Sequence, residues 1–200
     1  MTTALLVVAG YLLGSMPWGY WLVRLLKHDD IRRHGSGNVG GSNVWRAFGW
    51  RLGLPVVLLD TLKGFAPALV ATLVVSHLAG VLAGAAAMLG HWRPLFLRWR
   101  RGGKMVATCG GAFLGVAPVV GGIGAGVWIL VFIVFRYASL ASIVAALSLP
   151  AIAALLDEPW PVIGFAGGAG VAVVILHRAN VARLRAGTES RFRFRRAASA

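Results

Sequence analysis

The sequence MVATCGGAFLGVAPVVGGIGAGVWILVFIVF, residues 105–135, contains no charged side chain and lies between two cations, Lys104 and Arg136. Its 31 residues are too many for one helical crossing of a bilayer, which takes about 20. Short loops rich in Lys and Arg stay on the cytoplasmic side of a membrane, so both cations are expected there. Two points on one side are joined by an even number of crossings. The stretch is therefore predicted to form a helical hairpin that turns between residues 118 and 124.

The composition of the whole chain is that of a membrane protein. Of its 200 residues, 58% are hydrophobic and 13% are charged, whereas the apolar share of soluble proteins is about 45–50%. A net charge of +14 would suggest nucleic acid as the partner of a soluble protein. Here the basic residues lie in short loops between apolar stretches, so we expect membrane lipids and no nucleic acid as partners. The single cysteine, Cys109, excludes a disulfide or a cysteine-based metal site within the chain.

The rule that two points on the same side are joined by an even number of crossings also gives a topology for the whole chain. The uncharged stretches are residues 3–23, 64–90, 105–135, 137–156 and 159–176, and the basic clusters between and after them are residues 27–51, 93–104, 136 and 178–196. Residues 53–90 then form another hairpin, which turns near Ser76 and His77, and the last two stretches form a pair that turns at residues 157–159.

The sequence thus predicts an all-α, single-domain polytopic membrane protein covering residues 1–200, with a basic tail from about residue 190 to 200. It has seven transmembrane helices, an outer N-terminus and a cytoplasmic C-terminus. Some crossings in the two middle hairpins have only about 15 residues, so re-entrant segments are an alternative there.

The first basic loop contains GSGNVGGSNVWRAFG, residues 35–49. Glycines let a backbone approach a ligand closely, so the amides of residues 36–41 can converge on an anion. Arg46 can add a bidentate contact, and Asn43 shares its face if a helix begins near Ser42. The alternative is a flexible linker, which a composition of Gly, Ser and Asn favours by itself.

The second basic loop ends in Gly102, Gly103 and Lys104, directly before an apolar stretch. Amides at a helix N-terminus and a Lys favour bound anions, so this tripeptide resembles a phosphate loop in mechanism. It is not a Walker A motif, because Arg98 stands at the position of its first glycine and Met105 at that of its Ser or Thr. The alternative is that the basic and Trp residues of this loop only anchor it at the membrane interface.

Two further polar pairs lie at membrane boundaries on the same predicted side. Ser139 and Ser142 are three residues apart, as are His177 and Asn180, which places both members of each pair on one helical face. A lone His at such a place is more often an interfacial residue than a catalyst. The presence of four polar side chains from different helices on one side of the membrane favours a catalytic or binding site.

Asp60 and Lys63 are predicted to lie inside the second helix, about 10 Å from its start at a rise of about 1.5 Å per residue. An unpaired charge inside a membrane is unfavourable. We therefore expect the two side chains to pair with each other, or with loop residues that dip inward, and to have a structural role.

Taken together, these segments resemble the acyl-phosphate-dependent glycerol-3-phosphate acyltransferases, which are bacterial inner-membrane enzymes of phospholipid synthesis. The resemblance is carried by seven segments in order: GSMPWGY (14–20), SGNVGGSNVWR (36–46), LLDTLKG (58–64), LGH (89–91), GGKMVAT (102–108), RYASLASI (136–143) and HRANVARLRAGTE (177–189). It implies seven helices with the main motifs in the cytoplasm. It also implies transfer of an acyl group from fatty acyl phosphate to the 1-hydroxyl of sn-glycerol 3-phosphate, giving lysophosphatidic acid and phosphate. No metal or other cofactor is expected.

The resemblance and the polar patterns together assign roles to individual residues. The expected catalytic residues are Ser36, Arg46, Lys104, His177 and Asn180. The expected substrate-binding residues are Gly37, Asn38, Asn43, Gly102, Gly103 and Ser142. The expected structural residues are Asp60, Lys63 and Glu189. Two roles stay open for His177, general base or substrate binding, because the phosphate of the acyl donor can itself take the proton.

The chain departs from the family pattern at three places. Met105 stands where the family has Gly, the segment of residues 91–104 is one residue longer, and Ala179 replaces a residue that is commonly Glu.

The enzyme that forms acyl phosphate stays open as a partner of the basic tail. The alternative function is that of a non-catalytic membrane protein, such as a small organic-anion transporter. A transporter should carry polar residues near the middle of the membrane. Only Asp60 and Lys63 are predicted to lie near that depth.

Overall fold

The uncharged stretch of residues 105–135 forms two helices joined by a tight turn, α6 (Val106–Val116) and α7 (Pro118–Phe135), in a computed structural model that describes residues 1–192. The predicted hairpin is confirmed, but its turn lies at Ala117, one residue before the expected interval of residues 118–124, which belongs to α7. Pro118 begins α7, where its missing N–H costs no hydrogen bond. Gly121 lies within α7 and packs on α6, since a Cβ there would be 2.6 Å from the Leu114 nitrogen.

The described chain is all-helical, as predicted. Its other elements are α1 (Thr2–Gly14), α2 (Trp18–Lys27), η1 (Ile31–Arg33), α3 (Gly41–Phe48), α4 (Trp50–Val74), α5 (His77–Trp92), η2 (Leu95–Leu97), α8 (Ala138–Leu155), α9 (Trp160–Leu176) and α10 (Arg178–Arg185). The turns predicted near residue 76 and at residues 157–159 are both present. The part of the predicted basic tail that follows residue 192 lies outside the described residues.

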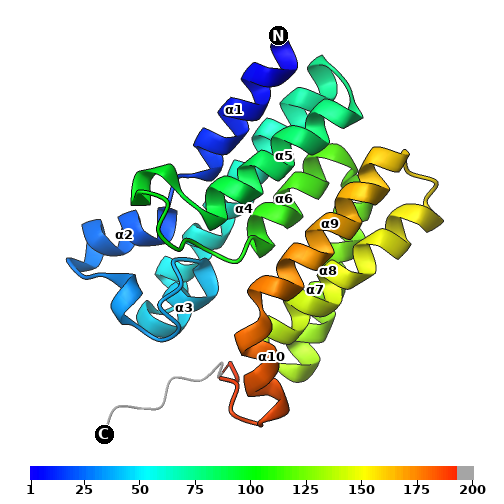
Figure 1. Ribbon diagram of the computed structural model, residues 1–200. Helices are drawn as coiled ribbons and strands as arrows, with labels where there is room; N and C mark the ends of the chain where they lie inside the picture. Colours follow the sequence, from blue (N-terminus) through cyan, green and yellow to red (C-terminus); the bar gives the residue numbers. More distant parts are fainter. Residues whose placement is uncertain (193–200) are drawn as a thin grey trace, which may run out of the picture.

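The helices form two groups that lie side by side (Figure 1): α1, α4, α5 and α6 pack together in one half, and α7, α8 and α9 in the other. Within residues 1–192, four segments are long and apolar enough to cross a membrane: Thr2–Lys27, Trp50–Val74, Pro118–Phe135 and Ala138–Leu155. A fifth arises if α9 and α10, which meet at a bend of 60°, are counted as one span. The chain is therefore a helical membrane protein, and the predicted number of seven crossings stays a prediction.

The first predicted span is interrupted at residues 15–17, where α1 ends and Pro17 precedes α2. Lys63 Nζ donates a hydrogen bond of 2.8 Å to the Met16 carbonyl oxygen inside this break. The same ammonium lies 2.8 Å from Asp60 Oδ1, and His91 Nδ1 lies 3.6 Å from that oxygen. The expected pairing of Asp60 with Lys63 is thus confirmed, and the pair stabilises the break in the first helix because it supplies a donor to its backbone.

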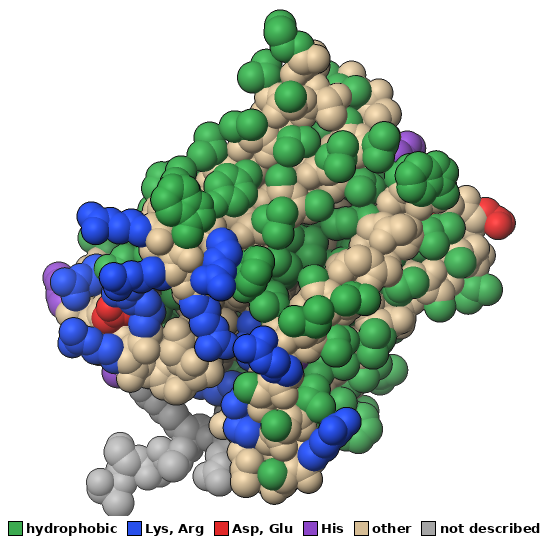
Figure 2. Space-filling model, viewed as in Figure 1, with side chains coloured by type: hydrophobic (Ala, Val, Ile, Leu, Met, Phe, Trp, Pro, Cys, Tyr) green, Lys and Arg blue, Asp and Glu red, His purple; other side chains and the backbone are tan. Residues whose placement is uncertain are grey.

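Charged side chains are segregated along the bundle. Figure 2 shows Lys and Arg gathered at the end formed by α2, α3, α10 and the loop between α5 and α6. The turn between α8 and α9, which carries Asp157 and Glu158, lies at the other end with the N-terminus. The basic end is the one predicted to face the cytoplasm.

Glycine permits close approach between helices at some positions and not at others. Gly111 on α6 faces α4, where an added Cβ would lie 1.9 Å from the Thr61 carbonyl oxygen, closer than real Cβ contacts come. Gly110, its neighbour in the same helix, has no such atom within 4 Å. Other helical glycines divide in the same way, with close neighbours at Gly80, Gly84, Gly121 and Gly170 and none within 4 Å at Gly122, Gly167 and Gly168.

We therefore expect Gly111→Ala to destabilise the protein by about 1–3 kcal/mol, because backbone atoms of α4 must move. Gly110→Ala is the matched control and should be neutral, or stabilising by at most about 1 kcal/mol, because Ala is the better helix former. Unfolding in detergent, followed by circular dichroism, measures both variants. Equal stability of the two would contradict the packing described for α4 and α6.

Candidate active site

The first basic loop is folded around the side chain of Asn43, which lies at the start of α3. Its Oδ1 accepts a hydrogen bond from the Ser36 amide at 3.1 Å, and its Nδ2 donates to the carbonyl oxygens of His34 and Asn38 at 3.0 and 2.9 Å. Asn38 Nδ2 in turn donates to the Gly102 carbonyl oxygen at 3.4 Å. The loop is therefore an ordered turn tied to the second basic loop, and both Asn side chains are engaged in holding it.

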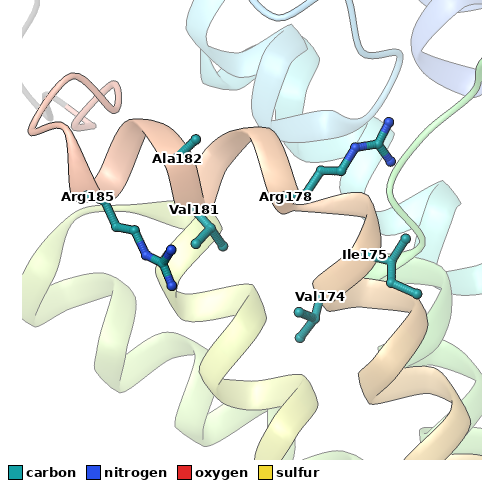
Figure 3. Close-up of a pocket in the computed structure, with 6 residues that line it drawn as sticks. All are labelled: Val174, Ile175, Arg178, Val181, Ala182 and Arg185. Carbon is teal, nitrogen blue, oxygen red and sulfur yellow. The ribbon is translucent and has the colours of Figure 1, made fainter.

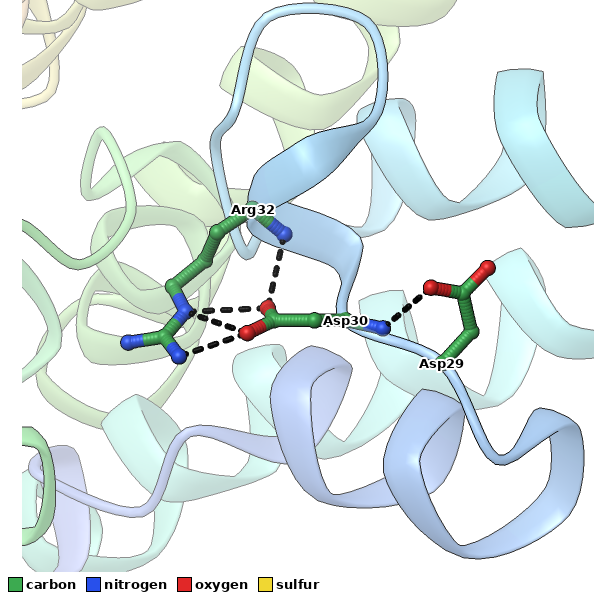
Figure 4. Close-up of polar contacts among 3 residues, drawn as sticks. All are labelled: Asp29, Asp30 and Arg32. Atoms are coloured by element: carbon green, nitrogen blue, oxygen red, sulfur yellow. Dashed lines mark hydrogen bonds and ion pairs between the residues drawn. The ribbon is translucent and has the colours of Figure 1, made fainter.

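A charge pair precedes this loop (Figure 4). The Arg32 guanidinium binds Asp30 with an Nη2 to Oδ2 distance of 2.6 Å, and Asp30 Oδ1 also accepts from the Arg32 amide at 3.0 Å. The Asp30 amide donates to Asp29 Oδ1 at 2.6 Å. Hydrogen bonding by Arg32 lowers the pKa of Asp30 to about 2. Arg32 is thus already paired with a carboxylate, whereas Arg46 forms no ion pair among residues 1–192.

The two glycines of the second loop are packed against the end of α5. The Gly102 and Gly103 amides donate to the carbonyl oxygens of Trp92 and His91, each at 2.9 Å. A Cβ on Gly103 would lie 1.8 Å from His91 Nε2, so the backbone packs against the Nε2 edge of the imidazole ring. Since both amides are engaged by α5, the groups left for an anion at this loop are the Lys104 ammonium and the first turn of α6. A substrate-binding role for the two glycines stays a prediction.

A buried carboxylate, Glu189, connects the polar residues at this end of the bundle. Its Oε1 accepts hydrogen bonds from Ser139 Oγ at 2.7 Å and Asn180 Nδ2 at 2.6 Å, and its Oε2 accepts from Arg183 Nε at 2.7 Å. Asn180 Oδ1 accepts a hydrogen bond from the Lys104 ammonium. Burial raises the pKa of Glu189, but the three hydrogen bonds lower it by more, so the group is an ionised carboxylate.

Three cations surround this one carboxylate. Arg46, Lys104 and Arg183 all lie close enough to Glu189 and to one another to change each other's ionisation. Burial lowers the pKa of Lys104 to about 8, and the neighbouring arginines add to this shift while Glu189 opposes it. The site keeps an excess of positive charge, which suits a multiply charged anion.

His177 lies at the bend between α9 and α10 and is buried. Its Nδ1 is 2.8 Å from the Val173 carbonyl oxygen. A carbonyl can only accept, so Nδ1 carries the proton and the neutral ring presents Nε2 as an acceptor. The charge of Lys104 acts on this ring. His177 therefore belongs to the same cluster, with Nε2 as its unprotonated nitrogen.

Two of the predicted residues are placed differently. Ser142 Oγ donates to the Ala138 carbonyl oxygen at 2.6 Å and accepts from Trp128 Nε1 at 3.1 Å, which ties it to α7. The Ser36 side chain is exposed, and no hydrogen bond of its hydroxyl is found within residues 1–192. Their roles in catalysis or binding stay predictions.

The predicted residues that the fold brings together are Arg46, Lys104, His177, Asn180 and Glu189. Ser139 and Arg183, which had no assigned role, complete the hydrogen bonds of Glu189. The three-residue spacing of Ser139 and Ser142 was a signal for the former. Nothing in the local sequence indicated that Arg183 pairs with Glu189.

A groove of about 440 Å³ lies beside the cluster, on the bend between α9 and α10 (Figure 3). It is lined by Val174, Ile175, Arg178, Val181, Ala182 and Arg185. Apolar side chains alternate there with two arginines, a combination that suits an apolar chain with an anionic head. None of the residues hydrogen-bonded to Glu189 lines it.

A family model described as glycerol-3-phosphate acyltransferase matches residues 4–187. The chain belongs to the glycerol-3-phosphate acyltransferase family. It is 43% identical to the glycerol-3-phosphate acyltransferase of Desulforudis audaxviator, with 98% of both chains covered. It is 40% identical to that of Geotalea daltonii, with 94% of this chain and 96% of the relative covered.

Solved structures agree with this assignment. A crystal structure of PlsY, an integral membrane glycerol 3-phosphate acyltransferase, in its glycerol 3-phosphate form matches with a TM-score of 0.92 at 39% identity, covering 96% of each chain. Its lysophosphatidic acid form matches with a TM-score of 0.89 at 38% identity. Membership of the acyltransferase family favours an enzyme over the transporter alternative.

Met105, which stands where the acyltransferase family pattern has Gly, adopts a left-handed backbone with φ of 68° at the start of α6. A glycine takes this conformation without strain, whereas a side chain does not. The Met105 side chain is 4% exposed and belongs to the apolar core, together with Met88. The side chain therefore packs into the apolar core and does not crowd Lys104.

At residue 105, the strained backbone destabilises the protein and the buried side-chain contacts stabilise it. Two substitutions can separate these effects. Met105→Gly relieves about 1 kcal/mol of backbone strain but removes buried contacts of about 2 kcal/mol or more, so we expect net destabilisation. Met105→Ala removes the same contacts and keeps the strain, and should be less stable than Met105→Gly by about 1 kcal/mol. Unfolding midpoints in detergent measure both. An Ala variant as stable as the Gly variant would show that φ at this position is not strained.

Proposed function

We propose that this chain transfers an acyl group from a fatty acyl phosphate to the 1-hydroxyl of sn-glycerol 3-phosphate. The products are lysophosphatidic acid and inorganic phosphate, and the reaction is the first step of phospholipid synthesis. The relatives are named glycerol-3-phosphate acyltransferases, and the matched structures are glycerol 3-phosphate and lysophosphatidic acid forms of such an enzyme. The observation that carries the proposal is the convergence of three cations on one buried carboxylate. Such a site suits substrates that both carry phosphate.

The chemistry matches the residues of the cluster. The hydroxyl oxygen of glycerol 3-phosphate forms a bond to the acyl carbon, the bond from that carbon to the phosphate oxygen breaks, and the hydroxyl proton leaves with the phosphate or passes to His177 Nε2. An acyl phosphate is already activated, so the enzyme works mainly by holding two anions in contact. Arg46 binds a substrate phosphate, and Lys104 binds phosphate and stabilises the developing oxyanion. Asn180 and Glu189 hold Lys104 in place. The reaction as written needs no metal or other cofactor.

We place this cluster on the cytoplasmic side of the bacterial inner membrane. The proposed topology has seven helices crossing the bilayer, with the N-terminus outside and the C-terminus inside. Its support is the gathering of Lys and Arg at the end that carries the cluster, which the positive-inside rule assigns to the cytoplasm. A soluble enzyme that forms acyl phosphate would meet the site on that side.

The decisive experiment is a phosphate-release assay. Purified protein in lipid and detergent should release phosphate from palmitoyl phosphate only when glycerol 3-phosphate is present. Arg46→Ala and Lys104→Ala should each lower the rate by about 100-fold or more, because the first removes a contact that binds a substrate phosphate and the second removes charge that faces the reacting groups. Arg51→Ala, which removes an exposed cation at the start of α4, is the control and should retain the wild-type rate. An inactive wild-type protein would refute the proposed function.

The rate should also fall at alkaline pH. Lys104 has a pKa of about 8 instead of the usual 10.5, so its charge is present below pH 8 and is lost as the pH rises above it. Phosphate monoesters are already dianionic there, since their second pKa is about 6. We expect kcat/KM to decline above pH 8 by about tenfold per pH unit. Lys104→Arg should retain its charge and show no decline up to about pH 9.5, because the Arg pKa exceeds about 12. Parallel profiles for the two proteins would contradict this assignment.

A further inference from the structure

Phe192, at the end of the described chain, is 7% exposed although its neighbours Ser190 and Arg191 are exposed. Its amide donates a hydrogen bond of 2.8 Å to the Arg136 carbonyl oxygen, between α7 and α8. Three residues earlier, Glu189 is bound to α8 and α10. The short segment after α10 thus returns to the basic end of the bundle and is fastened at both of its ends (Figure 1).

The ring of Phe192 lies between α3 and α7. The Arg46 guanidinium carbon is 4.6 Å from its centroid, and Trp45 contacts it edge-on at 6.1 Å. Both of these residues belong to α3. On the other side, Phe132 of α7 contacts the same ring at 5.1 Å. One side chain therefore joins α3 to the C-terminal helices, beside the cluster of cations.

The contact with Arg46 bears on substrate binding. Arg46 is exposed and forms no ion pair or hydrogen bond among residues 1–192, so Phe192 is the contact that orients its guanidinium. An aromatic face attracts a cation and fixes the plane of an arginine without using its N–H donors. Those donors remain free for a phosphate. A guanidinium that is ordered in advance loses less conformational entropy when the substrate binds.

We propose that Phe192 is a positioning residue of this site, which holds Arg46 in the orientation that receives a substrate phosphate. The inference rests on the proposed acyltransferase function and goes beyond it, because it gives the C-terminal segment a part in binding. The ring touches neither substrate nor reacting atoms. Its loss should therefore weaken binding of one of the two phosphate-bearing substrates and leave the chemical step unchanged.

The test compares full-length variants in the phosphate-release assay. Phe192→Leu should raise KM for glycerol 3-phosphate or for palmitoyl phosphate by about two- to five-fold, the range of an exposed cation–π contact, with kcat unchanged. The KM that rises identifies which phosphate Arg46 receives. Phe192→Tyr retains the ring and should restore the wild-type KM. Phe192→Met serves as a second apolar variant in case Phe192→Leu does not fold. Phe96→Leu, which removes another ring at the basic end, one packed on Trp21, is the control and should have no effect.

A double-mutant comparison separates positioning from packing. In an Arg46→Lys background, Phe192→Leu should cause no further rise in KM, because the guanidinium that the ring orients is gone. An equal rise in both backgrounds, or unchanged KM values for both substrates in the single variant, would overturn the inference. Wild-type turnover is measured first. Its absence counts against the proposed function, whereas an active wild type with an unaffected Phe192→Leu variant counts against the role of Phe192 alone.

Discussion

The Glu189 carboxylate is the interaction on which the arrangement of the site depends. A buried charge is tolerated only when hydrogen bonds and opposite charges compensate it, and here the compensating groups come from α8, from α10 and, through Asn180, from the loop before α6. These segments are far apart in sequence. The hydrogen bonds of Glu189 therefore bring Asn180 and Arg183 together and, through Asn180, hold Lys104 at the same place.

A second compensated charge lies deeper in the bundle and acts on the same loop. Asp60 and Lys63 pair within α4, Lys63 binds the broken backbone of the first helix, and His91 lies beside them. The opposite edge of the His91 ring supports Gly103. The residue before Lys104 therefore rests on this inner network, while the Lys104 ammonium is held by the outer one. The two networks together fix the position of the cation.

The distribution of partners explains which cations are free to bind a ligand. Arg32 is paired with Asp30, Lys63 with Asp60 and Arg183 with Glu189. Arg46 has an aromatic ring as its neighbour and Lys104 has a neutral amide, so both keep an uncompensated charge. Arg46 and Lys104 combine proximity to the cluster with charge that no carboxylate neutralises directly. Most of the others serve orientation and contact with anionic lipid.

The sequence by itself determined the helical class, the two internal hairpins, the segregation of charge and the pairing of Asp60 with Lys63, because charge-free length and helical spacing are local properties. It also identified most members of the cluster through short motifs. Only the tertiary structure decided that Glu189 connects them, that the amides of Gly102 and Gly103 bind α5, that Gly111 is close-packed while Gly110 is not, and that Phe192 covers Arg46. Each of these depends on which distant segments meet, and hydrogen-bond partners and ring contacts across the bundle leave no local pattern in the chain.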